Sequence, residues 1–297
     1  MTEGTQTQFE PMGIGAILDR SFSLYRQNLI RFLAIVAVIQ VPLLLLSFAL
    51  QYLLFKNLTQ PEPGQFSANQ FLPALVAGLV ILAANTLSNG AMARAVSDAY
   101  LGRDVGVGAT YGKVLPRLLS LLGVTLVIVL IGGGALVVVA LLFAVSPALG
   151  GLTMLVLGIF AIVYALKISL SAQAIVVENV GTFPGITRSM TLTLGNLGKV
   201  FLLFLAVFLI TLIVNWVFGF LGRLIAPPPE MITSAEKLDA FIRSIRVQQL
   251  IQSVGQLLIA PFAAGASVLM YYDLRIRKEG FDLEMLAQSM GQPATEP

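Results

Sequence analysis

Apolar residues in this chain are gathered into six long runs, and short polar segments separate them. The runs cover residues 32–55, 71–93, 118–146, 151–177, 200–222 and 247–272. A helix rises ~1.5 Å per residue and the hydrocarbon layer is roughly 30 Å thick, so about 20 apolar residues suffice to cross it. Each run reaches that length. The pattern therefore predicts an all-α integral membrane protein with six transmembrane helices.

The third and fourth runs form the longest stretch without charge. From Leu118 to Leu166 there is no Lys, Arg, Asp or Glu, and only the turn at 146–151 interrupts the apolar character. The composition agrees, because 57% of the 297 residues are hydrophobic and only 11% are charged. Soluble domains carry about a quarter charged residues. We expect all six runs to remain in the mature protein, because the first is too long and too far from Met1 for a signal peptide.

Basic residues are distributed unequally between the two sides of the predicted bundle, and such a bias sets orientation. Twelve fall on the side of the termini: Arg20, Arg26, Arg31, Arg94, Arg103, Lys113, Arg117, Arg188, Lys199, Arg275, Arg277 and Lys278. Five fall on the other: Lys56, Arg223, Lys237, Arg243 and Arg246. We expect both termini in the cytoplasm. Beyond the membrane on the other side, a capping-box pattern at 233–236 predicts a separate short surface helix before the last span.

An internal repeat is visible when the chain is shifted by 168 positions. Residues 20–24 (RSFSL) then fall on 188–192 (RSMTL), and Asn28-Leu29 on Asn196-Leu197. A weaker copy starts near Val107, and in each copy apolar residues at helical spacing precede a span. This predicts three parallel hairpin repeats, each preceded by a cytoplasmic interfacial amphipathic helix. The expected boundaries are about 12–98, 105–178 and 182–273, followed by a cytoplasmic tail at 274–297.

The end of the last span and the start of the chain carry distinctive motifs. Residues 271–284 (YYDLRIRKEGFDLE) and 15–26 (GAILDRSFSLYR), with the six-span layout, resemble the bacterial family called the glycerophosphoryl diester phosphodiesterase membrane domain. The resemblance implies a stand-alone membrane domain. In some members of that family this domain precedes a catalytic barrel that uses histidines and carboxylates. This chain has no histidine, so we expect that the enzyme activity does not transfer.

Acidic residues stand at the cytoplasmic ends of the even-numbered spans, one in each predicted repeat: Asp98, Glu178 and Asp273. Three carboxylates near a common axis could bind a cation or hold a proton. Alternatively they pair with Arg94, Arg188 and Arg275 and lock the interfacial helices to the hairpins. Ion pairs of that kind are much commoner than catalytic clusters, so pairing is the favoured interpretation.

Lys167 is the one charged residue well inside a predicted span, and charges inside a bilayer are expensive enough to suggest a function. It stands ~10 residues, or about 15 Å, before Glu178. We expect it to face polar groups of neighbouring spans, namely Asn85, Asn89 or Gln173; the alternative is contact with a substrate or a lipid phosphate. Contacts between Lys167 and the polar groups of neighbouring spans would give the bundle a polar interior.

Basic residues of the interfacial segments and the tail are candidate contacts for anionic lipid headgroups: Arg20, Arg26, Arg188, Arg275, Arg277 and Lys278. Each basic group beside an anionic leaflet contributes on the order of 1 kcal/mol of attraction. The plainer interpretation of the tail is an anchor at the membrane edge, with Tyr271 and Tyr272 at headgroup level. The sharper one is a binding site for a lipid headgroup or a protein partner.

The residue types present limit the possible functions. There is no cysteine and no histidine, and no motif for nucleotide, metal or nucleic-acid binding stands out. We therefore expect neither cofactor, metal nor nucleic acid, and a non-enzymatic lipid-interacting or scaffolding module of the bacterial inner membrane. Its partners would be lipids, another membrane protein or a second copy. The alternative is a permease-like or channel-like protein, which would need a polar interior around Lys167, whereas a scaffold would have a dry centre.

Overall fold

A computed structural model describes residues 11–58, 68–228 and 235–279. All regular structure in these ranges is helical. The expected tail falls partly outside them, because residues 280–297 are not described. The same holds for the start of the capping-box pattern at 233–234.

Six long helices account for most of the described chain: α2 (Leu29–Leu58), α3 (Ala68–Tyr100), α5 (Leu118–Val145), α6 (Pro147–Ile168), α9 (Leu197–Ile225) and α10 (Ala235–Glu279). Shorter helices lie between them: α1 (Ile14–Gln27), α4 (Val107–Val114), the 3₁₀ turn η1 (Leu115–Arg117), α7 (Ser171–Glu178) and α8 (Thr182–Thr193). Six segments of the described chain are long and apolar enough to cross a membrane. The predicted number of spans is thereby confirmed.

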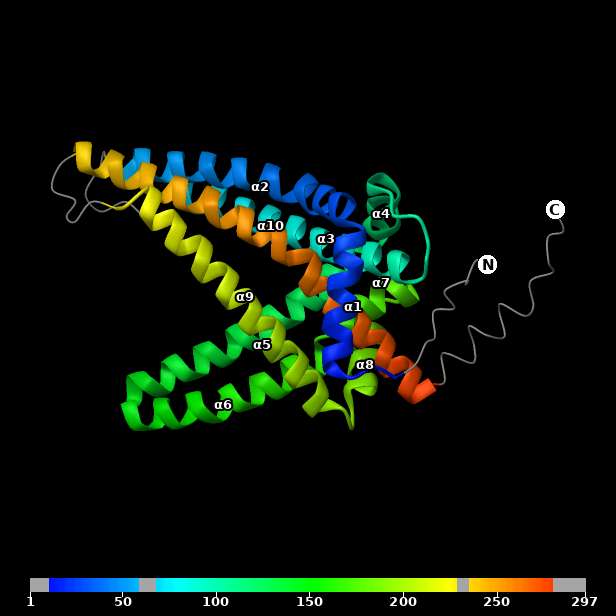
Figure 1. Cartoon of the computed structure of the whole chain (residues 1–297). Coiled ribbons are helices and arrows are strands. Elements are labelled where there is room, and N and C mark those ends of the chain that lie inside the picture. The colour runs from blue at the N-terminus through cyan, green and yellow to red at the C-terminus, as the bar shows by residue number, and fades with distance from the viewer. Residues whose placement is uncertain (1–10, 59–67, 229–234, 280–297) are drawn as a thin grey trace.

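The long helices all extend in one direction from a common end. Figure 1 shows α1, α4, α7 and α8 gathered at the right, which we call the cap end. The α5–α6 turn and the start of α10 lie at the left, which we call the loop end. Helix α2 packs against α3, α5 against α6, and α9 against α10. Figure 1 also shows the α5–α6 pair directed away from α2, α3 and α10 toward the loop end.

The hydrophobic core sits at the cap end and is built around α10, which contacts α1, α2, α3, α7, α8 and α9. Tyr271 and Tyr272 are completely buried there. Gly265 lets α1 approach α10 closely, because a Cβ atom at that position would lie 3.2 Å from the Cβ of Ser21. The α5–α6 pair contrasts with this core, since most of its residues beyond the cap end are exposed. In a bilayer those residues would contact lipid.

One local expectation proves wrong. Helix α10 runs as one 45-residue element from Ala235 to Glu279, so the segment before the last span continues the span and does not form a separate surface helix. No glycine or proline lies between Ala235 and Val247 to end the helix there. The fourth predicted run lies within one candidate span, Pro147–Glu178. Its helix has a two-residue break, because α6 ends at Ile168 and α7 begins at Ser171.

Candidate functional site

The carboxylate of Asp98 lies at the cap end of α3 among three cations. Its Oδ2 accepts hydrogen bonds from Arg94 Nε at 3.2 Å and Lys113 Nζ at 2.9 Å, and Arg103 approaches Oδ1 at 3.7 Å. Only 2% of Asp98 is exposed. A buried carboxylate is stable when it is paired and hydrogen-bonded. Because Lys113 belongs to α4, this cluster fastens α4 to α3.

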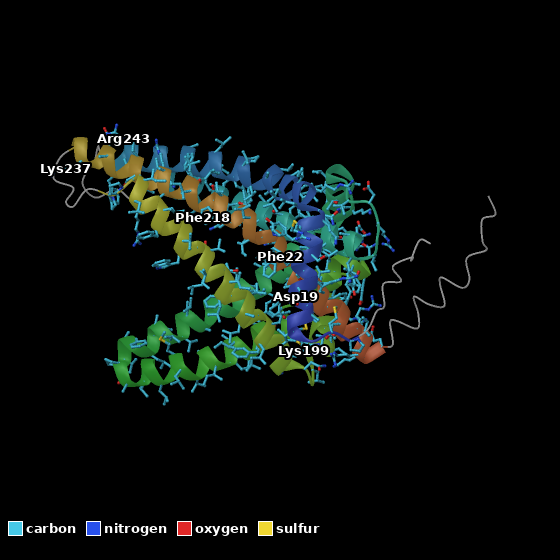
Figure 2. All side chains as sticks on the ribbon, in the orientation of Figure 1. Asp19, Phe22, Lys199, Phe218, Lys237 and Arg243 are labelled. Carbon is cyan, nitrogen blue, oxygen red and sulfur yellow. The ribbon has the colours of Figure 1, made fainter. Side chains whose placement is uncertain are left out.

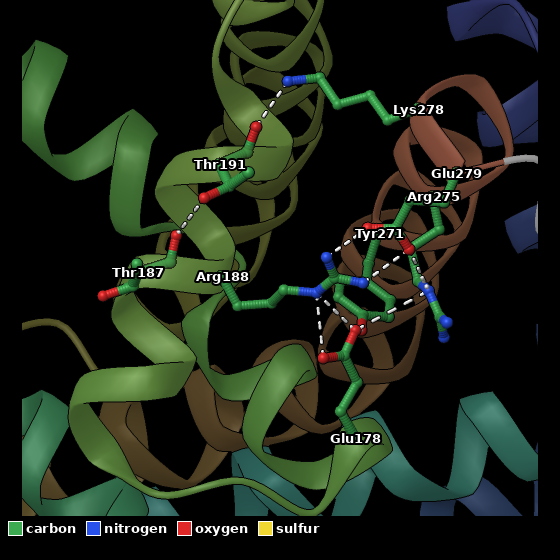
Figure 3. Close-up of polar contacts among 8 residues, drawn as sticks. All are labelled: Glu178, Thr187, Arg188, Thr191, Tyr271, Arg275, Lys278 and Glu279. Carbon is green, nitrogen blue, oxygen red and sulfur yellow. Dashed lines mark hydrogen bonds and ion pairs between the residues drawn. The ribbon is translucent and has the colours of Figure 1, made fainter.

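Glu178, the last residue of α7, is the centre of a second cluster, drawn in Figure 3. Arg188 of α8 donates from Nε to both carboxylate oxygens, at 2.8 and 3.0 Å, and bonds Glu279 at the end of α10 through its terminal nitrogens. The hydroxyl of Tyr271 also donates to Glu178. The hydrogen bond with Glu279 is the largest cause that raises the pKa of Arg188, so the guanidinium stays charged. The cluster joins α7, α8 and α10.

The third carboxylate, Asp273, is fully buried in α10. It accepts a hydrogen bond from the backbone N–H of Met12 at 2.6 Å and from Arg277 Nε at 3.0 Å, and it forms an ion pair with Lys199 of α9. The favoured pairing interpretation therefore holds for Arg94 and Arg188. Arg275 also pairs with one of the three carboxylates, Glu178, at 3.8 Å, and with Glu279 at 3.3 Å. One helical turn along α10 places Arg277, not Arg275, beside Asp273.

These three clusters are suited to holding helices together rather than to binding a free cation, because each carboxylate faces at least two cationic groups. Within the described ranges, no group of three or more histidines, cysteines or carboxylates could hold a metal ion.

Most of the candidate headgroup contacts are engaged inside the protein. Arg188 and Arg275 bind carboxylates, Arg277 binds Asp273, and Lys278 donates to the backbone carbonyls at the end of α8. Lysine at a helix C-terminus is favourable, because the carbonyls there lack partners within the helix. The remaining two, Arg20 and Arg26, are exposed on α1 and form no hydrogen bond or ion pair with any described residue.

The backbone of Lys167 lies beside a cap-end helix. Lys167 is the second-last residue of α6, and its backbone carbonyl accepts hydrogen bonds from the hydroxyls of Ser189 and Thr193 in α8. Lys167 therefore lies next to α8, just before the two-residue break after Ile168. Its ammonium group has no hydrogen-bond or ion-pair partner among the described residues.

The polar residues expected around Lys167 have other neighbours. Asn85 accepts a hydrogen bond from Gln40 of α2 at 3.2 Å, and Gln173 donates to Ser267 of α10 at 2.9 Å. Asn89 faces a different space, described below. The four candidates therefore do not form one polar site. The amides join pairs of helices, as polar side chains commonly do inside membrane bundles.

A recess of about 540 Å³ lies between α3 and the α5–α6–α7 segment. Its walls are mostly aliphatic and aromatic, with a few polar groups: Thr86, Asn89, Thr125, Tyr164 and Ser169. The volume falls within the range of small-molecule sites. At its cap end the lining residues Leu121 and Ile168 are buried, whereas Ile131 and Phe160 toward the loop end are exposed. The recess is thus open to the surface that a bilayer would cover.

The cap end of the recess is closed by tight packing. A Cβ atom at Gly90 of α3 would lie 2.6 Å from Leu121 Cδ1 and 3.0 Å from Val114 Cγ1, so the glycine allows the helices to meet there. Leu121 and Val114 belong to a buried cluster with Ile168 and Val176. Sequence reasoning missed this recess. Its apolar lining is indistinguishable in sequence from any lipid-facing surface, and only the divergence of α5–α6 from α3 creates it.

The comparison with known families gives a match over most of the chain. The family model described as a domain of unknown function, DUF7847, matches residues 12–274. The chain belongs to this family. The DUF7847 match extends from Met12, which binds Asp273, to Leu274, so it covers five candidate spans completely and most of the sixth, Asp239–Glu279. It therefore includes the three carboxylate clusters apart from Arg275, Arg277 and Glu279. No curated protein and no solved structure matches the chain.

Proposed function

We propose that this member of the DUF7847 family is a non-enzymatic, lipid-interacting module of the bacterial inner membrane, with the cap end in the cytoplasm. The single observation that carries the proposal is the apolar recess between α3 and α5–α6, which opens toward the bilayer and is closed toward the cap end. A recess of this kind in hydrocarbon suits an acyl chain, because its walls are mostly apolar and the hydroxyls of Thr86, Thr125 and Ser169 donate to backbone carbonyls of the protein.

Three parallel hairpin repeats are part of the proposal. Helices α1 and α8 begin at Ile14 and Thr182, and the spans after them begin at Leu29 and Leu197. Both pairs are separated by the 168 positions of the sequence repeat. The seventh residue of each short helix before an odd-numbered span is basic: Arg20, Lys113 and Arg188. Lys113 and Arg188 each bind the carboxylate at the end of the preceding span, which supports an equivalent construction of the units.

Exposed apolar side chains support an interfacial position for the short helices. Phe22 of α1 is 56% exposed, Leu115 of η1 58% and Phe183 of α8 72%. A helix at the membrane surface inserts such residues to headgroup depth while its polar face remains in water. The free guanidinium groups of Arg20 and Arg26 would then lie beside anionic headgroups. The charge bias of the sequence makes that leaflet the cytoplasmic one.

The interior polar groups favour this function over a permease. A path for a polar solute needs a lining of polar groups, yet Asn85 and Gln173 are bonded across helices and Lys167 lies at the cap end. The resemblance of residues 271–284 to the glycerophosphoryl diester phosphodiesterase membrane domain fits the same proposal. It would make the chain a related membrane domain that acts without the catalytic barrel.

Native mass spectrometry of the purified protein tests the proposal. Replacement of Gly132, which lines the recess, by Phe should fill it and reduce the amount of retained phospholipid several-fold. Gly133→Phe is the matched control, because Gly133 is adjacent, does not line the recess and also has open space around its Cβ position. Equal lipid retention by wild type and both variants would refute the recess as a lipid site.

A further inference from the structure

A second hollow lies at the loop end, between α9 and α10, and the sequence did not reveal it. Its volume is about 710 Å³. Along α9 the lining extends from Phe208 to Arg223, which is 15 residues or about 22 Å of helix. That length corresponds to roughly one leaflet of a bilayer with its headgroups. We call this hollow the α9–α10 groove.

Glycines on α9 bring polar side chains of α10 into the groove. A Cβ atom at Gly219 would lie 3.1 Å from Gln252 Nε2, and one at Gly222 would lie 3.2 Å from the Cα of Gln248. Gln248 uses its amide to donate to the carbonyl of Ala226 at 2.8 Å, which caps the end of α9. The glycine face thus allows the two helices to approach while glutamine side chains lie along the groove.

The groove contains polar groups without protein partners. Arg223 and Gln252 are exposed and line it, and neither forms a hydrogen bond or ion pair with any described residue. Arg223 is at the loop-end limit of the groove. Gln252 lies deeper, about 13 Å along α10 from Arg243, an exposed residue nearer the loop end. An unpaired amide at the depth of Gln252 is costly in hydrocarbon, and an unpaired guanidinium at the end of the groove is attracted to anionic headgroups. They therefore require acceptors from the membrane or from a bound molecule.

The order of groups along the groove matches one class of molecule. A guanidinium lies at headgroup level, amides of Asn215 and Gln252 lie deeper, and Phe208 and Leu212 lie deepest. A glycerophospholipid presents a phosphate, then ester carbonyls that only accept hydrogen bonds, and then acyl chains. Trp216 also lines the groove and is stacked on Phe220. Tryptophan is favoured near the membrane interface, where one edge of the ring meets polar groups.

We propose that the α9–α10 groove binds a glycerophospholipid of the loop-end leaflet through a contact between Arg223 and the phosphate. This site goes beyond the recess of the proposed function and is separate from it, since the two share no residue. The orientation given above makes the bound lipid one of the outer leaflet. Gln252 donates to an ester carbonyl, and Trp216 packs against the glycerol and upper chain region.

Trp216 is the only tryptophan in the chain, so all tryptophan fluorescence comes from this one position in the lining of the groove. The full chain is reconstituted in vesicles of a brominated, phosphate-free galactosyl diacylglycerol, which quenches tryptophan on contact. Unbrominated phosphatidylglycerol at 10 mol% is then added. We expect recovery of fluorescence that corresponds to roughly tenfold preference for phosphatidylglycerol over the host lipid, as expected for one charge-assisted contact.

Three variants and one competitor define the outcome. The preference should disappear in Arg223→Gln and persist in Arg223→Lys. It should also persist in Arg243→Gln, which removes an exposed arginine near the same end of α10 but outside the groove (Figure 2). An absent preference in the wild type, or an equal one in all variants, would overturn the proposal. Loss of the preference on addition of 10 mM inorganic phosphate would overturn the lipid assignment and identify a free-anion site.

Discussion

Arg188 Nε donates to both carboxylate oxygens of Glu178, at 2.8 and 3.0 Å, and so joins α8 to the end of α7. The same guanidinium reaches Glu279 of α10 through its other nitrogens. Arg188 and Glu178 are 24% and 20% exposed. At such partly buried sites an ion pair is screened less than at the surface, and removal of one member leaves the other uncompensated.

Arg188→Gln should therefore destabilise the protein by about 2 kcal/mol, because two carboxylates lose their shared partner. Thermal unfolding in detergent, followed by circular dichroism, measures this effect. Arg26→Gln is the matched control, since Arg26 is exposed on a neighbouring cap-end helix and has no partner among the described residues. Equal midpoints for the two variants would mean that the cluster contributes nothing to stability.

Asp98 and Lys113 should be energetically coupled, because they join α3 to α4 at 2.9 Å. A double-mutant cycle with Asp98→Asn and Lys113→Met should give a coupling free energy of about 1 kcal/mol. Lys113 is half exposed, which keeps the value modest. Unfolding midpoints of the four proteins in urea supply the cycle, and additive single effects would exclude the coupling.

The close approach at Gly90 gives a prediction about packing. Gly90→Ala should cost about 1–3 kcal/mol, since the added methyl would lie 2.6 Å from Leu121 Cδ1 and would force it to move. Gly78→Ala in the same helix should be neutral or slightly stabilising, because no atom lies within 4 Å of its Cβ position. Stability measurements on both variants separate crowding from helix propensity. A neutral Gly90→Ala would mean that this end of the recess is loosely packed.

Lys167→Met should leave stability within about 0.5 kcal/mol of the wild type, because the ammonium group has no partner among the described residues. The unfolding midpoint checks this expectation. A large loss of stability would mean that Lys167 has a binding partner in the membrane, and Lys167 would again be a candidate functional residue.

The sequence was sufficient for the part of the fold that depends on local composition. The apolar runs gave the number of spans, because twenty apolar residues have few alternatives to a membrane helix. The spacing of charges was enough to predict the ion pairs of Asp98 with Arg94 and of Glu178 with Arg188. Both arise within one helix or between neighbouring short helices. Pairs joined across the fold, such as Asp273 with Lys199, could not be predicted from spacing.

The cavities and the position of Lys167 could not be predicted, for related reasons. The recess exists because α5–α6 diverges from α3, and the α9–α10 groove because glycines of α9 face glutamines of α10. Both features depend on how two helices pack, and such packing produces no periodic pattern in the sequence of either helix. The break after Ile168 is equally hidden, since Ser169 and Leu170 are ordinary helix residues in sequence. Hydroxyl contacts from α8 hold the carbonyl of Lys167 at that break.

The central claim is that an acyl chain occupies the recess, and photo-crosslinking in native membranes tests it most directly. Tyr164 lines the recess, and 4-azidophenylalanine replaces it with little change in shape. The account predicts a covalent adduct with the mass of a glycerophospholipid. The same reagent at Tyr111, equally half-buried but bonded to the carbonyl of Ile35, should give links to protein only. Protein links alone at both positions would contradict the account.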